Sequence, residues 1–266
     1  MAKWLVIPRF HLSVIDLHMK DIYALGRMAT GYTERIAHLR DEVLSSQSTI
    51  CIERAQCYTE IYQAHRDKPI AIRRALALDK TLREMTVFIE DGALIVGNQS
   101  SQLRAAPIFP EYAVEWIQNE IDEFEKRPGD RFFPSAEVKR ELLEICSFWA
   151  GATTLDKGRA LMSPTLRSIH KANIIRAEGN LTSGDAHIAV DDRRILNEGL
   201  GAYQDRVRDA LDVCDISRRD GLKRRVFYEA LLISLKALEA FIGRFAALAG
   251  EMATHEDAPG RKAELS

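Results

Sequence analysis

Apolar residues recur at helical spacing along most of this 266-residue chain. After Thr33, which suits an N-cap, Ile36, Leu39 and Val43 share one face and predict a helix from Thr33 to Ser45. The same spacing predicts five further helices: through Ala55, Tyr58 and Tyr62; after Pro69 with Ile72, Ala75, Leu76 and Leu82; from Glu111 with Val114, Ile117, Ile121 and Phe124; from Ser135 with Val138, Leu142 and Ile145; and from Gly221 to Ala249. We therefore expect a mainly α-helical fold.

A small β element is expected between these helices. Val87–Ile89 and Leu94–Val96 are short β-prone runs, and Asp91-Gly92 between them suits a tight turn. The two runs predict a small antiparallel β-hairpin or ribbon. The following segment, Gly97–Pro110, is rich in amide, hydroxyl and proline residues and predicts an irregular loop.

Composition limits the classes of partner. The chain is 46% hydrophobic and 29% charged, with a formal net charge of -2, so we expect no nucleic acid as a partner. Charged and histidine side chains interrupt the N-terminal apolar residues, which argues against a signal peptide or a membrane span: Lys3, Arg9, His11, Asp16 and His18. The default location is the cytoplasm.

The cysteine and histidine residues do not form a familiar metal or disulfide pattern. The four cysteines are scattered and contain no Cys-x-x-Cys pair: Cys51, Cys57, Cys146 and Cys214. We expect them to be reduced, buried or incidental thiols. His65, His170 and His255 lack a second ligand at metal-like spacing, so we predict no metal and no bound cofactor.

A series of short strings, in a fixed order, carries a family resemblance. The strings are Arg35–Arg40, Glu53–Ala55 with Thr59–Glu60, Arg73–Ala75, Asp91–Asn98, Arg104–Glu111, Trp116, Gly184–His187 and Leu196–Gly201. In this order they resemble the N-terminal region of pyruvate formate-lyase-like glycyl radical enzymes, especially the dehydratase and lyase branch. The resemblance covers about residues 32–250. Residues 1–31 are then expected to be a divergent leader and residues 251–266 a charged, disordered tail.

The resemblance implies a fold and a type of chemistry. Members of the family are longer chains that form a barrel of two half-barrels, and this chain would correspond to its outer helical layer and first elements. An activating enzyme that uses S-adenosylmethionine and an iron–sulfur cluster installs a radical on a backbone glycine. The radical passes to a cysteine, which takes hydrogen from the substrate.

Neither residue of that radical pathway has a counterpart here. The family glycine lies in an Arg-Val-x-Gly-Tyr-like string, and the cysteine lies in a Gly-Cys-Val-Glu-like loop or a Cys-Cys pair, and none of these occurs in the sequence. Cys51 stands two residues before Glu53, but Ile50 precedes it where the loop has glycine. We therefore assign no catalytic residue and expect the chain alone to be inactive. Its expected partners are the missing C-terminal part or a second chain, and the activating enzyme in full-length members.

His187 is the best candidate for a functional residue. A neutral imidazole exchanges protons near neutral pH, and the family has a histidine on a substrate-facing loop at this place in the order of strings. The alternative is a surface or loop-packing histidine, and Ala186 replaces the glycine commonly found before it. Asp185 is a weaker substrate-binding candidate. Asp185 and Asp191 either orient His187 or cap neighbouring helices, and capping is the commoner role.

Basic and aromatic residues leave two further alternatives. Four arginines either clamp an anionic substrate or, as we prefer, pair structurally with Glu60, Glu90 or Glu111: Arg54, Arg73, Arg74 and Arg104. Four aromatic residues either line a cavity or belong to the core: Phe109, Trp116, Phe124 and Trp149.

Two hypotheses of function follow. The first is the N-terminal segment of a radical dehydratase, lyase or formate acetyltransferase-like enzyme. The alternative is a non-catalytic helical binding or assembly module derived from that family.

Overall fold

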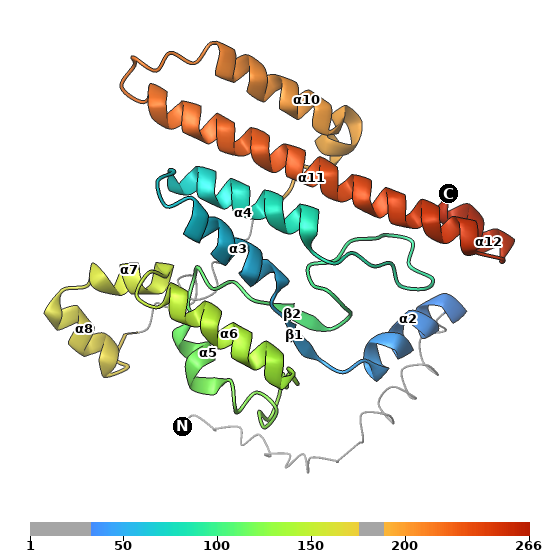
Figure 1. Cartoon of the computed structure of the whole chain (residues 1–266), viewed down its shortest axis with the longest axis horizontal. Coiled ribbons are helices and arrows are strands. Elements are labelled where there is room, and N and C mark those ends of the chain that lie inside the picture. The colour runs from blue at the N-terminus through green and yellow to red at the C-terminus, as the bar shows by residue number, and fades with distance from the viewer. Residues whose placement is uncertain (1–32, 176–188) are drawn as a thin grey trace, which may run out of the picture.

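A computed structural model describes residues 33–175 and 189–266 of the protein. The predicted leader, residues 1–31, lies outside the described residues. The first half of the chain contains α2 (Glu34–Ser45), β1 (Thr49–Cys51), α3 (Glu53–Ala64), α4 (Ile70–Glu84), β2 (Ala105–Pro107) and α5 (Glu115–Glu120). The second half contains α6 (Ala136–Trp149), α7 (Thr154–Ala160), α8 (Pro164–Lys171), α10 (Asp192–Asp212), α11 (Gly221–His255) and α12 (Pro259–Leu265), as Figure 1 shows. The mainly α-helical fold is confirmed.

Helix starts follow the local signals in the sequence. The Thr33 hydroxyl accepts a hydrogen bond from the Ile36 amide at 3.4 Å, and the Ser135 hydroxyl accepts one from the Val138 amide at 3.2 Å. Each bond satisfies one of the amides that a helix N-terminus leaves free. The predicted starts of α2 and α6 are therefore confirmed, because a capping residue acts within its own turn.

The small β element is present but does not lie where the sequence placed it. β1 pairs with β2 in parallel, with Thr49 opposite Ala105. The predicted hairpin of residues 87–96 forms no ladder, although the turn at Gly92 is made, with φ +81°. The Thr86 carbonyl accepts from the Asn98 side chain at 2.8 Å, and the Thr86 amide donates to Glu53 at 2.8 Å. The amide and carbonyl of Thr86, the residue just before the first predicted strand, therefore already bond side chains and not a neighbouring strand.

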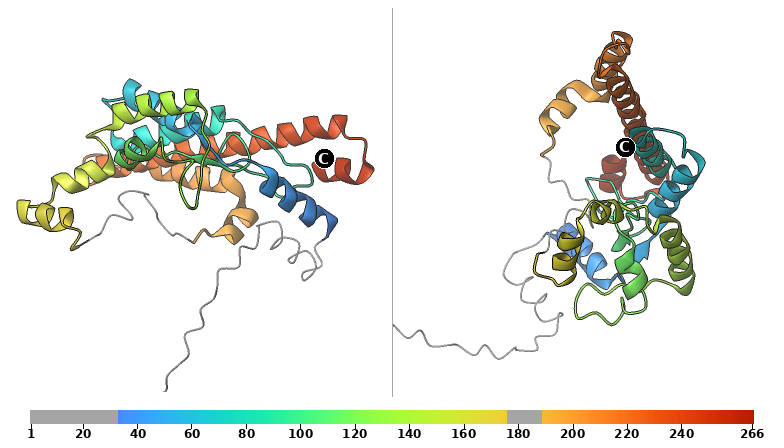
Figure 2. Two further views of the ribbon diagram at one scale, coloured as in Figure 1. Left: turned by 90° about the horizontal axis from the view of Figure 1, so that it is seen from below. Right: turned by 90° about the vertical axis from the view of Figure 1, so that its left-hand side faces the viewer.

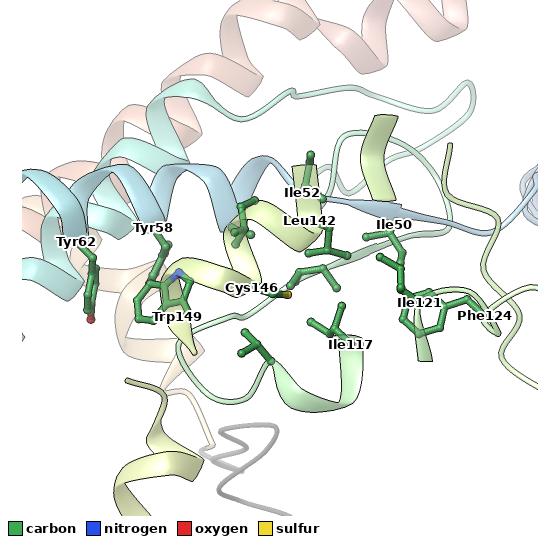
Figure 3. Close-up of a cluster of buried hydrophobic side chains, with 14 of the residues drawn as sticks. Ile50, Ile52, Tyr58, Tyr62, Ile117, Ile121, Phe124, Leu142, Cys146 and Trp149 are labelled. Atoms are coloured by element: carbon green, nitrogen blue, oxygen red, sulfur yellow. The ribbon is translucent and has the colours of Figure 1, made fainter. Parts of the chain in front are cut away.

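The main core lies between α3, α5 and α6 (Figure 3). Leu142 and Cys146 of α6 are fully buried against Ile117 of α5 and Ala55 of α3. Phe124 and Trp149 are core residues, whereas Phe109 and Trp116 are partly exposed. The sequence left open whether these four aromatic residues belong to the core or line a cavity. The core interpretation is confirmed for Phe124 and Trp149. Burying a large apolar side chain stabilises the fold by about 1.5–3 kcal/mol.

A second layer consists of α4 and the α10–α11 pair (Figure 1). Ile72 and Ala75 of α4 are buried with Ala230 of α11. Arg244 of α11 donates to the carbonyls of Leu82 and Met85 at 2.9 and 2.6 Å, which satisfies groups at the C-terminus of α4. The long helix predicted from Gly221 is confirmed and continues to His255.

The C-terminal segment differs from the disordered tail that its composition suggested. α11 runs through residues 251–255, and α12 then folds back so that Leu265 is buried. Figure 2 shows α12 and α8 at opposite ends of the molecule. Arg35 of α2 pairs with Glu264 of α12. Tertiary contacts therefore order a segment whose own apolar content is too small to do so. Among the described helices, none is both long and apolar enough to cross a membrane.

Candidate functional site

The clearest concentration of buried charge is the contact between Arg54 and Glu111. Arg54 lies in the first turn of α3, and Glu111 lies in the loop before α5. The guanidinium donates to the two carboxylate oxygens at 2.6 and 3.1 Å, and to the Ile108 carbonyl at 3.3 Å. The side chains are only 13% and 4% exposed. This is the two-pronged geometry that makes an arginine–carboxylate pair strong and directional.

Two aromatic rings enclose the same guanidinium. Arg54 lies 3.7 Å from the centre of the Tyr58 ring and 3.8 Å from that of Phe109. Burial raises the pKa of Tyr58, and the Arg54 charge opposes part of that shift. Stacking on both faces favours arginine over lysine, whose ammonium is not planar. We call these four residues, Arg54, Tyr58, Phe109 and Glu111, the arginine centre.

The arginines of α4 lie beside this centre. Arg73 is 5.0 Å from the centre of the Tyr62 ring, and Arg74 is 5.7 Å from that of Tyr112. Burial raises the pKa of Tyr62, and the positive charge of Arg74 opposes this. Within the described residues, Arg73 Nε is buried without a hydrogen-bond partner. Neither arginine forms a salt bridge with a carboxylate in the described structure, so the predicted structural pairing holds for Arg54 only.

Arg104 has a different role from the pairing that the sequence suggested. It donates to the carbonyls of Ser46 and Val43 at 2.7 and 3.5 Å and so satisfies the C-terminal end of α2. Arg104 also lines a groove of about 610 Å³ beside β2, together with Arg131. Arg131 donates to the Arg127 carbonyl at 2.7 Å. Both arginines thus have a structural contact with a backbone carbonyl, and the charge of neither is paired with a carboxylate in the described residues.

The predicted partners Glu60 and Glu90 are used elsewhere. The Glu60 carboxylate lies 3.1 Å from the Lys80 ammonium, and the Glu90 main-chain carbonyl accepts from Arg261 at 3.3 Å. The structure therefore connects Glu60 to a lysine and Glu90 to the C-terminal helix. Among residues 33–175 and 189–266, neither glutamate forms an ion pair with Arg54, Arg73, Arg74 or Arg104.

The thiols are placed as the interpretation of the sequence expected. Cys51, Cys57 and Cys146 are buried, and Cys214 is half-buried. Cys51 accepts a hydrogen bond from the Ser101 amide at 3.3 Å. Burial raises the pKa of Cys57 and raises that of Cys146 to about 12. Thiols with such pKa values are neutral and poor nucleophiles near pH 7.

The two substrate-binding candidates, Asp185 and His187, lie outside the described residues. Asp191, just after them, accepts from the Arg194 amide at 3.2 Å at the start of α10, so its predicted capping role is confirmed. In the parts of the chain that the structure describes, no group of three or more potential ligands is arranged for a metal ion. The predicted lack of a metal stays a prediction.

Sequence reasoning missed the aromatic enclosure of Arg54. One part of the signal was present, because Arg54 and Tyr58 are four residues apart and therefore share a face of α3. Phe109 and Glu111 gave no comparable signal, since they are more than 50 residues away along the chain. Only packing of the loop before α5 onto α3 brings them together.

Comparisons with known proteins agree over most of the chain. The sequence model of the family described as "Pyruvate formate lyase-like" matches residues 29–266. The probable dehydratase YbiW of Escherichia coli is 44% identical over 229 residues, which is 86% of this chain and 28% of that protein. The (2S)-3-sulfopropanediol dehydratase of Klebsiella oxytoca is 34% identical over 238 residues, covering 87% of this chain and 29% of the relative.

A solved structure gives the same result for the fold. The glycerol-bound B12-independent glycerol dehydratase of Clostridium butyricum superposes with a TM-score of 0.84 at 30% identity. The match covers 88% of this chain and 30% of that one. The chain thus spans less than a third of the length of the relatives that it matches.

Proposed function

This chain belongs to the pyruvate formate lyase-like family, and on that premise we propose that it forms the N-terminal layer of a glycyl radical dehydratase or lyase. The observation that supports the proposal is agreement in both sequence and fold with dehydratases over 86–88% of the chain. The dehydratase names of these relatives favour this branch over a formate acetyltransferase. The fold by itself does not distinguish the two activities, because one fold serves many activities.

The 266 residues alone do not catalyse the radical reaction under this proposal. The sequence contains neither the glycine string that stores the radical nor the cysteine string that relays it. Both have to come from further polypeptide, either continuous with this chain or separate. An activating enzyme that uses S-adenosylmethionine and an iron–sulfur cluster would install the radical there. The buried, high-pKa Cys146 thiol is a poor substitute for the relay cysteine.

His187 is the residue of this chain that we propose to act on the substrate. Loss of water from an alcohol requires a proton to reach the departing hydroxyl, and an imidazole with a pKa near 6.5 can hold and deliver it. Asp185 would orient the ring or bind a second substrate hydroxyl. Both residues precede α10 in the sequence, and Asp191 caps the first turn of that helix.

The exposed apolar surface favours the enzyme-segment hypothesis over an autonomous binding module. Four large apolar residues are more than half exposed: Leu196 on α10, Val213 just after it, and Leu222 and Phe227 on α11. A module adapted to exist alone rarely exposes many large apolar residues, because contiguous apolar patches promote association. An enzyme segment, in contrast, would cover them with the rest of its barrel.

Sequencing the native gene and transcript beyond codon 266 tests the proposal directly. We expect coding sequence, in frame or in a neighbouring gene, for a Gly-Cys-x-Glu string and an Arg-Val-x-Gly-Tyr-like string. Unrelated sequence throughout this region would remove the radical function and leave the helical binding module.

Reconstitution gives a biochemical test of His187. The restored protein, reduced and activated without oxygen, should show a glycyl radical by electron paramagnetic resonance. His187→Gln should keep that radical but lower kcat for dehydration by roughly 10²–10⁴-fold, the usual contribution of a general acid or base. A His170→Gln variant, altered at a different histidine, provides the control. If His187→Gln retains full kcat, the proposed proton transfer is wrong.

A further inference from the structure

The loop between α4 and β2 carries an unusual apolar tip. Leu94, Ile95 and Val96 are 65%, 94% and 40% exposed. The twelve residues from Gly92 to Leu103 contain no charged side chain. Single exposed apolar residues are common on proteins, but three in succession within an uncharged loop indicate a surface that another molecule covers. We call residues 94–97 the apolar tip.

The main chain of this tip is also open. Among the described residues, the amides and carbonyls of Leu94 to Gly97 have no hydrogen-bond partner, and the Asn98 side-chain oxygen is buried without one. Water can satisfy the exposed groups of the free chain. A partner that covers the apolar side chains excludes that water and must supply hydrogen bonds itself. A polypeptide with free main-chain groups meets both requirements.

Three separate segments hold the tip in place. On the N-terminal side, Arg35 of α2 donates to the Gly92 carbonyl at 3.0 Å, and Arg261 of α12 donates to the Ala93 carbonyl at 2.8 Å. On the other side, Asn98 donates to the Thr86 carbonyl at 2.8 Å. Fixing a loop before binding lowers the entropy that association costs. The apolar tip is therefore exposed and also anchored.

We propose that the apolar tip is the docking element for the polypeptide that completes the pyruvate formate lyase-like domain. The length of the relatives points to this occupant, since the chain matches only 28–30% of their length. The inference rests on the proposed function and assigns residues to the contact. Ile95 is the central side chain of the interface, and the main chain of Leu94 to Gly97 supplies its hydrogen bonds.

Co-expression with a defined probe tests the inference. The probe is the part of Escherichia coli YbiW outside the segment that this chain matches, carrying an affinity tag. The full 266-residue chain is compared with Ile95→Asp and with Leu161→Asp. Leu161 is a matched control because it is 90% exposed, apolar and located at the end of α7. Circular dichroism of each purified chain checks that the helices remain.

We expect the wild-type chain and Leu161→Asp to be retained by the probe, and Ile95→Asp to bind roughly tenfold or more weakly, because a buried isoleucine is replaced by a charge. Exchange of the Leu94 to Gly97 amides should slow in the complex. Equal binding by Ile95→Asp and Leu161→Asp, or unchanged exchange at the tip, would overturn the inference alone. Failure of the wild-type chain to bind would overturn both the inference and the proposed assembly.

A second copy of this chain is the competing occupant. Sedimentation of the chain without probe distinguishes it. A monomer supports the proposal. Self-association that Ile95→Asp abolishes and Leu161→Asp preserves would show that the tip binds another copy, and the proposal for the missing polypeptide would be wrong.

Discussion

The Trp149 indole donates a hydrogen bond to the Thr59 hydroxyl at 2.9 Å in the buried space between α6 and α3. Thr59 in turn donates to the Ala55 carbonyl at 2.7 Å. The hydroxyl thus satisfies the only polar group of a tryptophan that packs 4.7 Å from the Tyr62 ring centre. The hydrogen bond joins α6 to α3, the helix that carries Arg54.

Thr59→Val keeps the shape of the side chain but removes the acceptor. We expect a loss of about 1–3 kcal/mol in the free energy of unfolding, because the indole N–H stays buried without a partner. Urea unfolding measures the loss. In a Trp149→Phe background the same substitution should cost distinctly less. An equal cost in both backgrounds would show that the hydrogen bond contributes nothing.

Glu111→Gln removes the negative charge from the arginine centre. We expect a loss of about 3–5 kcal/mol, since the Arg54 cation remains enclosed without its counter-ion. Glu115→Gln is the matched control, because Glu115 pairs with Arg159 on the surface. An exposed pair contributes about 0–1 kcal/mol, so this control should unfold nearly like the wild type. Equal losses for the two variants would contradict the buried pair.

Cys146 predicts how stability changes in alkali. The unfolded thiol ionises near a pKa of about 8.5, whereas burial raises the pKa in the folded chain to about 12. The folded state therefore binds the proton more tightly. Its contribution to stability is complete below about pH 8.5 and declines as the pH rises toward 12. Urea titrations measure the difference in unfolding free energy between the wild type and Cys146→Ala. We expect this difference to become smaller from pH 8 to pH 10.5. A constant difference would show that the pKa of Cys146 is not raised in the folded chain.

Arg261 predicts order in the loop that carries the apolar tip. Its side chain is 10% exposed and donates to the carbonyls of Ala93 and Glu90. Arg261→Met should speed amide exchange around residues 90–97, because two of the anchoring bonds are lost. Lys262→Met alters the neighbouring residue, whose ammonium has only a 3.5 Å contact with the Glu256 carbonyl. If both variants exchange at the wild-type rate, α12 does not hold the loop.

The sequence by itself determined the features that depend on near neighbours. Thr33 and Ser135 cap helices within one turn, and apolar spacing located the faces of α3, α6 and α11. The ordered strings identified the family, and the missing radical strings are a property of the 266 residues. Such signals act over a few residues or are read directly as letters, so they need no knowledge of packing.

Tertiary structure decided what depends on distant segments. Val87–Ile89 and Leu94–Val96 had the propensity for a hairpin, yet Glu53 and Asn98 bind the backbone at Thr86 and the strands form at β1 and β2. Arg54 finds Glu111 57 residues away, and α12 is ordered by Arg35. β propensity and charge pairing depend on which partners packing supplies, and composition alone does not contain that information.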